Sequence, residues 1–188
     1  DWQEKSTGVS SLGAGFGTTG GSFGGGIVDN NFLGQGVTLD TNFAVSKRSL
    51  KGQFVYSKPN FNYTDNTLFT SVKSTSTDRL SDSGYKTSEI GLSLGTSFEQ
   101  YEDLFFRPDI SVTYENLETS STASANYKKQ EGNFFDTYFV YSLDYDQTNQ
   151  RYRPTSGYRT IFYQEVPILS DGYELVNSIE TTKYHELP

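Results

Sequence analysis

The sequence predicts an all-β protein, an antiparallel transmembrane β-barrel of which about ten strands are present. Apolar residues recur at every second position along most of the chain, as in Val37, Leu39 and Phe43 against Thr38 and Asp40. Hydrophobic residues make up only 34% of the chain, while aromatic residues reach 15%. Because alternate residues of a strand face opposite sides, this pattern gives one apolar, lipid-facing side and one polar, wet side.

Strand length supports the same fold class. Dividing the chain at clusters of Gly, Asn, Asp, Ser and Pro gives strands of roughly 9–14 residues. Strands of soluble proteins average about five or six residues, whereas tilted membrane strands need about 9–11, so length favours a membrane barrel over a β-sandwich. The predicted strands cover residues 9–18, 21–31, 36–47, 50–58, 66–78, 86–99, 104–117, 134–147, 157–168 and 173–185.

The composition excludes several classes of protein. Soluble domains average nearer half apolar residues, and disordered chains are poor in aromatic residues. The net charge of −8 disfavours nucleic acid as a partner. The absence of cysteine excludes disulfides and thiolate metal sites, and we expect no cofactor and no metal. No run approaches about 18 apolar residues, so no transmembrane helix is predicted.

The predicted connections differ in length. Residues 19–21, 47–49 and 100–103 form short turns, whereas residues 118–133 form a long polar loop. We expect short turns at one end of the barrel and long loops at the other, as in outer-membrane barrels. Aromatic residues near strand ends suggest interfacial girdles, although β-propensity alone also enriches them. These residues are Phe61, Tyr63, Tyr101, Phe105, Phe106, Phe134, Tyr152 and Tyr158.

Residues 15–20 match the GxGxxG pattern of dinucleotide-binding loops. That interpretation needs a helix directly after the glycines, but residues 21–26 contain four glycines and cannot propagate one. We interpret the segment as a glycine-rich hairpin. Gly13, Gly15 and Gly17 fall on one face of its first strand, where they weaken the strand and allow close backbone approach. Such a strand separates easily from its neighbour.

Few residues suggest catalysis. His185 is the one histidine of the chain, and Asp144 shares a strand face with Asp146. Such groups can act as acids and bases, and Glu174 and Glu180 form a second candidate pair on one strand face. We favour polar lining of a wet barrel interior for the carboxylates and a strand-end polar residue for the histidine. No catalytic residue and no enzymatic activity are predicted.

Four segments carry a family resemblance. They are EKSTG at residues 4–8, GAGFGTTGGSF at 13–23, NNFLGQG at 30–36 and YDQTNQRYRPTSGY at 145–158. The first three resemble the start of the barrel in the BamA family, the outer-membrane protein assembly factors (bacterial surface antigens) of Gram-negative bacteria. The fourth resembles the family's "PT-G" entry to a later strand, which related assembly and secretion barrels share.

The resemblance implies a sixteen-stranded barrel in the bacterial outer membrane. Residues 8–188 would be its N-terminal portion, and residues 1–7 the end of the last POTRA domain or a linker. The family's Val-Arg-Gly-Phe loop and final strands are absent, so we expect part of a larger barrel. The implied partners are nascent outer-membrane proteins, accessory assembly lipoproteins and the lipid bilayer.

In that family a lateral seam opens beside the first strand, and an incoming substrate strand pairs with the exposed edge. The resemblance places this strand at residues 9–17. An unpaired edge is a physical template for strand addition, which needs no catalytic chemistry. The substrate-docking residues are then Val9, Ser10, Ser11, Leu12, Gly13, Ala14, Gly15, Phe16 and Gly17.

Two other functions stay open on the sequence alone. A complete ten-stranded outer-membrane protease would bring His185 together with Asp144 or Asp146 near the barrel rim. A passive pore or adhesin would bind through the loop at residues 118–133, and single-channel conductance would distinguish a pore from a gated seam.

Overall fold

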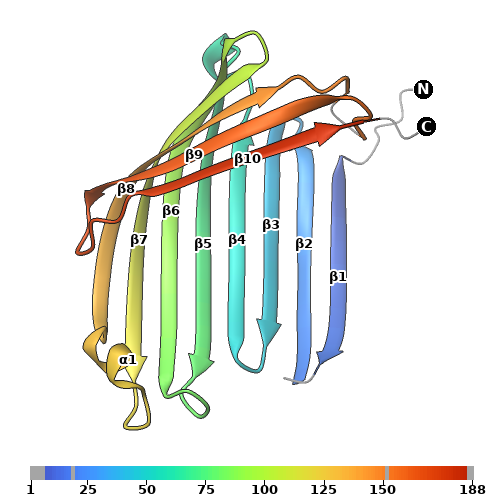
Figure 1. The fold of residues 1–188 in the computed structure, drawn as a ribbon. Coiled ribbons are helices and arrows are strands. Elements are labelled where there is room, and N and C mark those ends of the chain that lie inside the picture. Colours follow the sequence, from blue (N-terminus) through green and yellow to red (C-terminus); the bar gives the residue numbers. More distant parts are fainter. Residues whose placement is uncertain (1–6, 18–19, 151–152, 186–188) are drawn as a thin grey trace.

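The computed structural model describes residues 7–17, 20–150 and 153–185, and these form one ten-stranded antiparallel sheet. Each strand pairs with its neighbours in sequence, so the order in the sheet is β1 to β10 (Figure 1). The ten predicted strands are confirmed, with boundaries shifted by at most three residues. The elements are β1 (Gly8–Gly17), β2 (Gly20–Phe32), β3 (Val37–Ser46), β4 (Ser49–Lys58), η1 (Phe61–Tyr63), β5 (Thr67–Arg79), β6 (Tyr85–Tyr101), β7 (Leu104–Thr119), α1 (Ala125–Lys129), β8 (Gly132–Asp146), β9 (Gly157–Leu169) and β10 (Val176–Tyr184).

The sheet is curled but not closed. In Figure 1, β1 to β7 lie side by side and β8 to β10 cross obliquely over them, so that the sheet curves around a hollow. Among the described residues, β1 pairs only with β2 and β10 only with β9. This open sheet contradicts the complete ten-stranded barrel that the protease alternative requires. It agrees with the expectation of part of a larger barrel.

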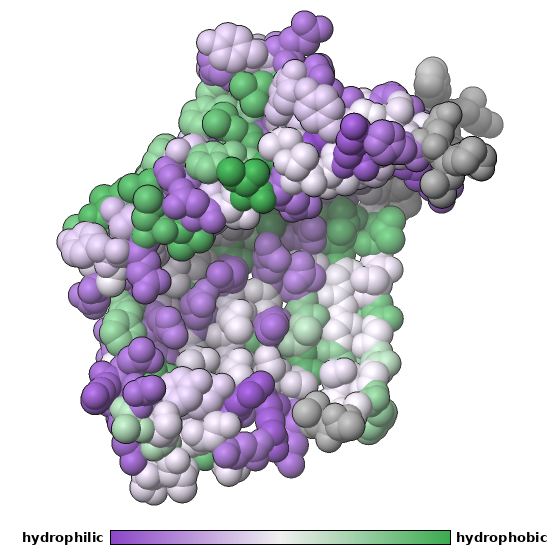
Figure 2. Space-filling view, viewed as in Figure 1, coloured by the Kyte–Doolittle hydropathy of each residue, from purple (hydrophilic) through white to green (hydrophobic). Residues whose placement is uncertain are grey.

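The two faces of the sheet differ in polarity, as the alternation predicts. Ser71, Ser93 and Ser111 pair in register across β5, β6 and β7 and line the hollow; we call this the concave face. In the adjacent row Leu94 pairs with Ile110 on the opposite, outer face, and both are exposed. Figure 2 shows hydrophilic residues gathered within the hollow over the central strands.

Little of the sheet is buried, because no second layer covers it. The buried hydrophobic side chains of the described residues are Val37, Phe69, Leu117, Ala123 and Val140. Large apolar side chains are instead exposed along the outer face of nearly every strand. Apolar exposure on this scale marks a surface whose surroundings are not water alone. None of the helices described here has the length and apolar character needed to cross a membrane.

The connections do not separate into short ones at one end and long ones at the other, so that prediction is wrong. Neighbouring strands are antiparallel, and the short turn 47–48 after β3 therefore lies at the same end as the loop 120–131 after β7 (Figure 1). The short turn 102–103 and the longer loop 147–156 share the other end. Strand order fixes the end at which a connection lies but not its length.

The loop between β7 and β8 folds back onto the end of the sheet. It contains α1 (Ala125–Lys129), which a two-residue periodicity does not predict. Ala123 is buried against Gly84, where a side chain would collide with the loop backbone. The ring of Tyr127 stacks on Tyr85 with centroids 4.3 Å apart, and their hydrogen bond raises the pKa of the Tyr127 hydroxyl.

Candidate functional site at the free edge of the first strand

The structure leaves one edge of β1 open, and this is the strand that the sequence analysis proposes for docking. All ten residues of β1 are exposed. Along its other edge the strand pairs with β2 in unbroken register over its whole length. The predicted residues 9–17 therefore lie together on a strand with one paired and one unpaired edge.

Hydrogen bonds fix which residues of β1 serve each edge. The Thr7 carbonyl accepts a bond from the Asn30 N–H at 3.3 Å, and the Gly15 carbonyl accepts one from the Ser22 hydroxyl at 3.4 Å. Both carbonyls thus point to β2. Along an antiparallel strand, alternate residues direct their N–H and C=O groups to opposite edges. Within residues 9–17, four residues therefore turn these groups to the open edge: Ser10, Leu12, Ala14 and Phe16.

The side chains of β1 differ in size between its two faces. Leu12 and Phe16 project from the outer face and are 77% and 96% exposed. Gly13 and Gly17 lie on the concave face, where a Cβ atom at either position would meet no atom within 4 Å. Because glycine contributes no side chain to packing, β1 is held mainly by its backbone bonds to β2.

This arrangement supports binding rather than a reaction. The open edge offers a ladder of backbone donors and acceptors, which is the surface that β-strand addition uses. Within the described ranges, no group of three or more His, Asp and Glu side chains is placed to hold a metal ion.

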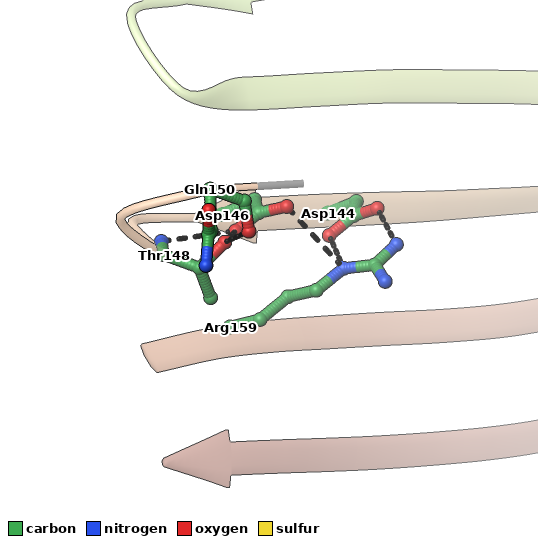
Figure 3. Close-up of polar contacts among 5 residues, drawn as sticks. All are labelled: Asp144, Asp146, Thr148, Gln150 and Arg159. Atoms are coloured by element: carbon green, nitrogen blue, oxygen red, sulfur yellow. Dashed lines mark hydrogen bonds and ion pairs between the residues drawn. The ribbon is translucent and has the colours of Figure 1, made fainter. Parts of the chain in front are cut away.

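The concave face carries ion pairs between neighbouring strands. The Lys73 ammonium of β5 lies 2.7 Å from a carboxylate oxygen of Glu89 on β6. Arg159 of β9 holds Asp144 of β8 through two guanidinium nitrogens, with its Nε at 2.8 Å (Figure 3). The same Nε lies 3.9 Å from Asp146. Asp144 and Asp146 thus line the concave face, as predicted.

The carboxylates considered for acid–base chemistry are either held by hydrogen bonds and ion pairs or do not share a strand face. Asp146 accepts bonds from the Thr148 N–H at 3.0 Å and from its hydroxyl at 2.7 Å (Figure 3). Glu174 precedes β10 whereas Glu180 lies within it, so the predicted pair on one strand face is wrong. His185 follows the last residue of β10, consistent with a strand-end polar residue.

Replacing Arg159 with alanine is expected to lower the free energy of unfolding by about 1 kcal/mol or less. The Arg159 side chain is 44% exposed, so water screens its attraction to the carboxylates and can solvate them when the guanidinium is removed. Urea unfolding of the purified protein in detergent would measure the loss. Arg159→Lys keeps the charge without the two-point contact and should give an intermediate value. A loss of several kcal/mol would show that the ion pair is essential to the sheet.

A packed cluster on the concave face was missed by the sequence analysis. Phe69 of β5 is only 4% exposed and pairs directly with Gly95 of β6. Its ring fills the place of the absent side chain, since a Cβ atom on Gly95 would lie 2.5 Å from Phe69 Cζ. The Arg107 guanidinium covers the ring at 3.9 Å from the centroid, a cation–π contact. One signal was available: Phe69 is a large apolar residue in the polar row of its strand.

Aromatic rings gather on the outer face, but one of the predicted girdle residues lies on the concave face. Phe106 contacts Phe98 and Tyr141, with centroids 5.7 and 6.0 Å apart, in edge-on geometry. Phe106 was among the expected girdle residues. Phe105 lines the concave face instead, because adjacent residues of a strand point to opposite sides. Tyr152 lies outside the described residues.

Comparison with known proteins gives one family and a matching fold. The Omp85 superfamily domain matches residues 31–187, which begin within β2. The structure is similar to the crystal structure of BamA from Haemophilus ducreyi lacking POTRA domains 1–3, with a TM-score of 0.70 and 22% sequence identity. The similarity covers 95% of this chain but only 37% of that BamA chain, and at this identity it shows the fold. No curated protein matches the sequence significantly.

Proposed function

The chain belongs to the Omp85 superfamily, and from this premise we propose that it forms the N-terminal part of a barrel that assembles β-barrel proteins into the bacterial outer membrane. In this proposal an incoming substrate strand pairs with β1 at a lateral seam. The open edge of β1 carries the proposal, because four residues direct unpaired backbone groups away from β2. No enzymatic step is involved.

The polarity of the two faces of the sheet suits a barrel in the outer membrane. The exposed apolar side chains of the outer face would contact lipid, and the polar concave face would line a wet interior. Residues 8–188 would then be the barrel portion. Residues 1–6, which the sequence analysis assigns with Thr7 to the end of a POTRA domain or a linker, lie outside the described residues.

The proposed partners follow from the same function. They are nascent outer-membrane proteins, which supply the incoming strand, and the lipid bilayer around the barrel. Accessory assembly lipoproteins are proposed from the resemblance to the BamA family. Nucleic acid is not among them, since the chain carries a net charge of −8.

Disulfide crosslinking tests the docking of a substrate strand. Cysteines placed one at a time along residues 9–17 should crosslink to cysteines in the terminal strand of a stalled substrate barrel. The crosslinks should follow one continuous register, since paired strands bring Cα atoms within the range a disulfide spans. Gln53→Cys is the matched control, because it lies in β4, which has neighbours on both edges. The absence of any crosslink along residues 9–17 would refute the proposed function.

A further inference from the structure

At two pairs in this sheet, a large side chain covers the glycine directly opposite it. On the outer face the Phe16 ring lies 3.5 Å from the position of a Cβ atom on Gly21. On the concave face the Phe69 ring occupies the space beside Gly95. In both cases the register pairs the two residues directly. A strand glycine can thus form a recess that a large cross-strand neighbour fills.

Three glycines on the concave face of β1 have no such cover. A Cβ atom on Gly13 or Gly17 would meet nothing within 4 Å, and one on Gly15 would meet only the Ser22 hydroxyl at 3.4 Å. Their partners in β2 are all small: Gly24, Ser22 and Gly20. The residues of β2 therefore leave the space beside these three glycines empty.

A strand added at the open edge of β1 would lie close to the same three glycines. Odd-numbered residues of β1 direct their backbone bonds to β2, as the carbonyls of Thr7 and Gly15 show. Every pair in the sheet is antiparallel, and a strand added at the open edge would continue that arrangement. Opposite such a strand, odd-numbered residues occupy non-hydrogen-bonded sites, where Cα atoms approach to about 4.5 Å rather than about 5.5 Å. Side chains of the added strand would lie beside the glycines at these close sites.

We propose that Gly13, Gly15 and Gly17 form a recess that selects incoming strands with large side chains at alternate, concave-facing positions. This specificity rests on the proposed docking function. The intervening residues of the same strand would face the outer side beside Leu12 and Phe16 and would be apolar. The preferred substrate strand thus alternates apolar residues with large ones such as tyrosine, phenylalanine or arginine. Small residues at the concave-facing positions would leave the recess empty and lose cross-strand contacts.

A size-exchange experiment in the complete protein, in its own membrane, tests this specificity. Crosslinking first identifies the residue of a model barrel substrate that lies opposite Gly15. Gly15→Val should slow assembly of the unaltered substrate about fivefold, because the valine occupies the recess. Truncating the opposite substrate residue to alanine should restore most of the rate. Gly52→Val is the matched control; it adds the same side chain in β4, which has neighbours on both edges, at a site where a Cβ atom would meet nothing within 4 Å, and it should slow neither substrate.

The outcomes separate this specificity from the docking function itself. Equal slowing of both substrates by Gly15→Val would overturn the recess and assign the glycine a role in strand flexibility. An unchanged rate with both substrates would overturn it as well. In either case crosslinks from Ser11→Cys to the substrate would leave the docking function standing. Loss of every crosslink along residues 9–17 would instead refute the docking function.

Discussion

Ala14→Pro is expected to slow assembly of substrate barrels by at least about tenfold while leaving the sheet intact. The Ala14 N–H faces the open edge, so proline removes a donor that an incoming strand would use without removing a bond to β2. Proline is tolerated at such an edge position, and the preceding Gly13 accepts the extended conformation that proline imposes. The carbonyl of the incoming strand would lose its partner, and the ring would obstruct close approach.

Two variants make this result interpretable. Ala14→Val keeps the donor and should assemble substrates at nearly the normal rate. Gly13→Pro removes a donor that serves β2, so it should loosen the hairpin of β1 and β2 in addition to any effect on assembly. Assembly rates in cells, with crosslinking to a stalled substrate, measure the first effect; protease sensitivity of the hairpin measures the second. Normal assembly by Ala14→Pro would show that the open edge is not the docking surface.

The alternation in the sequence predicts the ten strands because the two faces of this sheet have different surroundings. Residues 157–168 were expected as a strand, and β9 covers Gly157–Leu169. The short helix α1 left no comparable signal, since its five residues are too few to display a helical period. Its one local sign is Ser124, whose hydroxyl accepts a bond from the Tyr127 N–H at 3.4 Å.

The candidate site could be predicted only in part. Periodicity and glycine content identified residues 9–17 as a weakly packed strand, and the family resemblance gave that strand a role. Which backbone groups face the open edge depends on the register of β1 with β2, and register between strands is not a local property of the sequence. The contact of Arg159 with Asp144 also depends on register, because the two residues belong to different strands.

The cluster around Phe69 shows how the sequence can be locally informative yet insufficient. Phe69 is an apolar residue in the polar row of β5. Gly95 leaves a position without a side chain in the paired row of β6. Only the pairing of β5 with β6 reveals that each irregularity compensates for the other. The Arg107 guanidinium, from a third strand, then completes the cluster. Such a cluster favours the observed register of three strands in a sheet that buries few side chains.

Gly95→Ala is therefore expected to lower the free energy of unfolding by about 3 kcal/mol, at the upper end for overpacked sites. The added Cβ atom would lie 2.5 Å from both Phe69 Cζ and the Pro108 carbonyl oxygen, and would also collide with Asp109. The ring can rotate away only by giving up its contact with Arg107, and the carbonyl belongs to a paired strand. Urea unfolding in detergent, followed by the mobility shift of the folded barrel, measures the change.

Gly52→Ala is the matched control for this change. Gly52 also lies within a strand, but a Cβ atom there would meet nothing within 4 Å. Alanine at that position should raise the free energy of unfolding by about 0.5 kcal/mol, since it reduces the freedom of the unfolded chain. Phe69→Ala combined with Gly95→Ala should cost less than the sum of the two single changes, because they share one contact. Equal effects of Gly95→Ala and Gly52→Ala would mean that the ring does not pack against Gly95, and the three strands would then need another cause for their register.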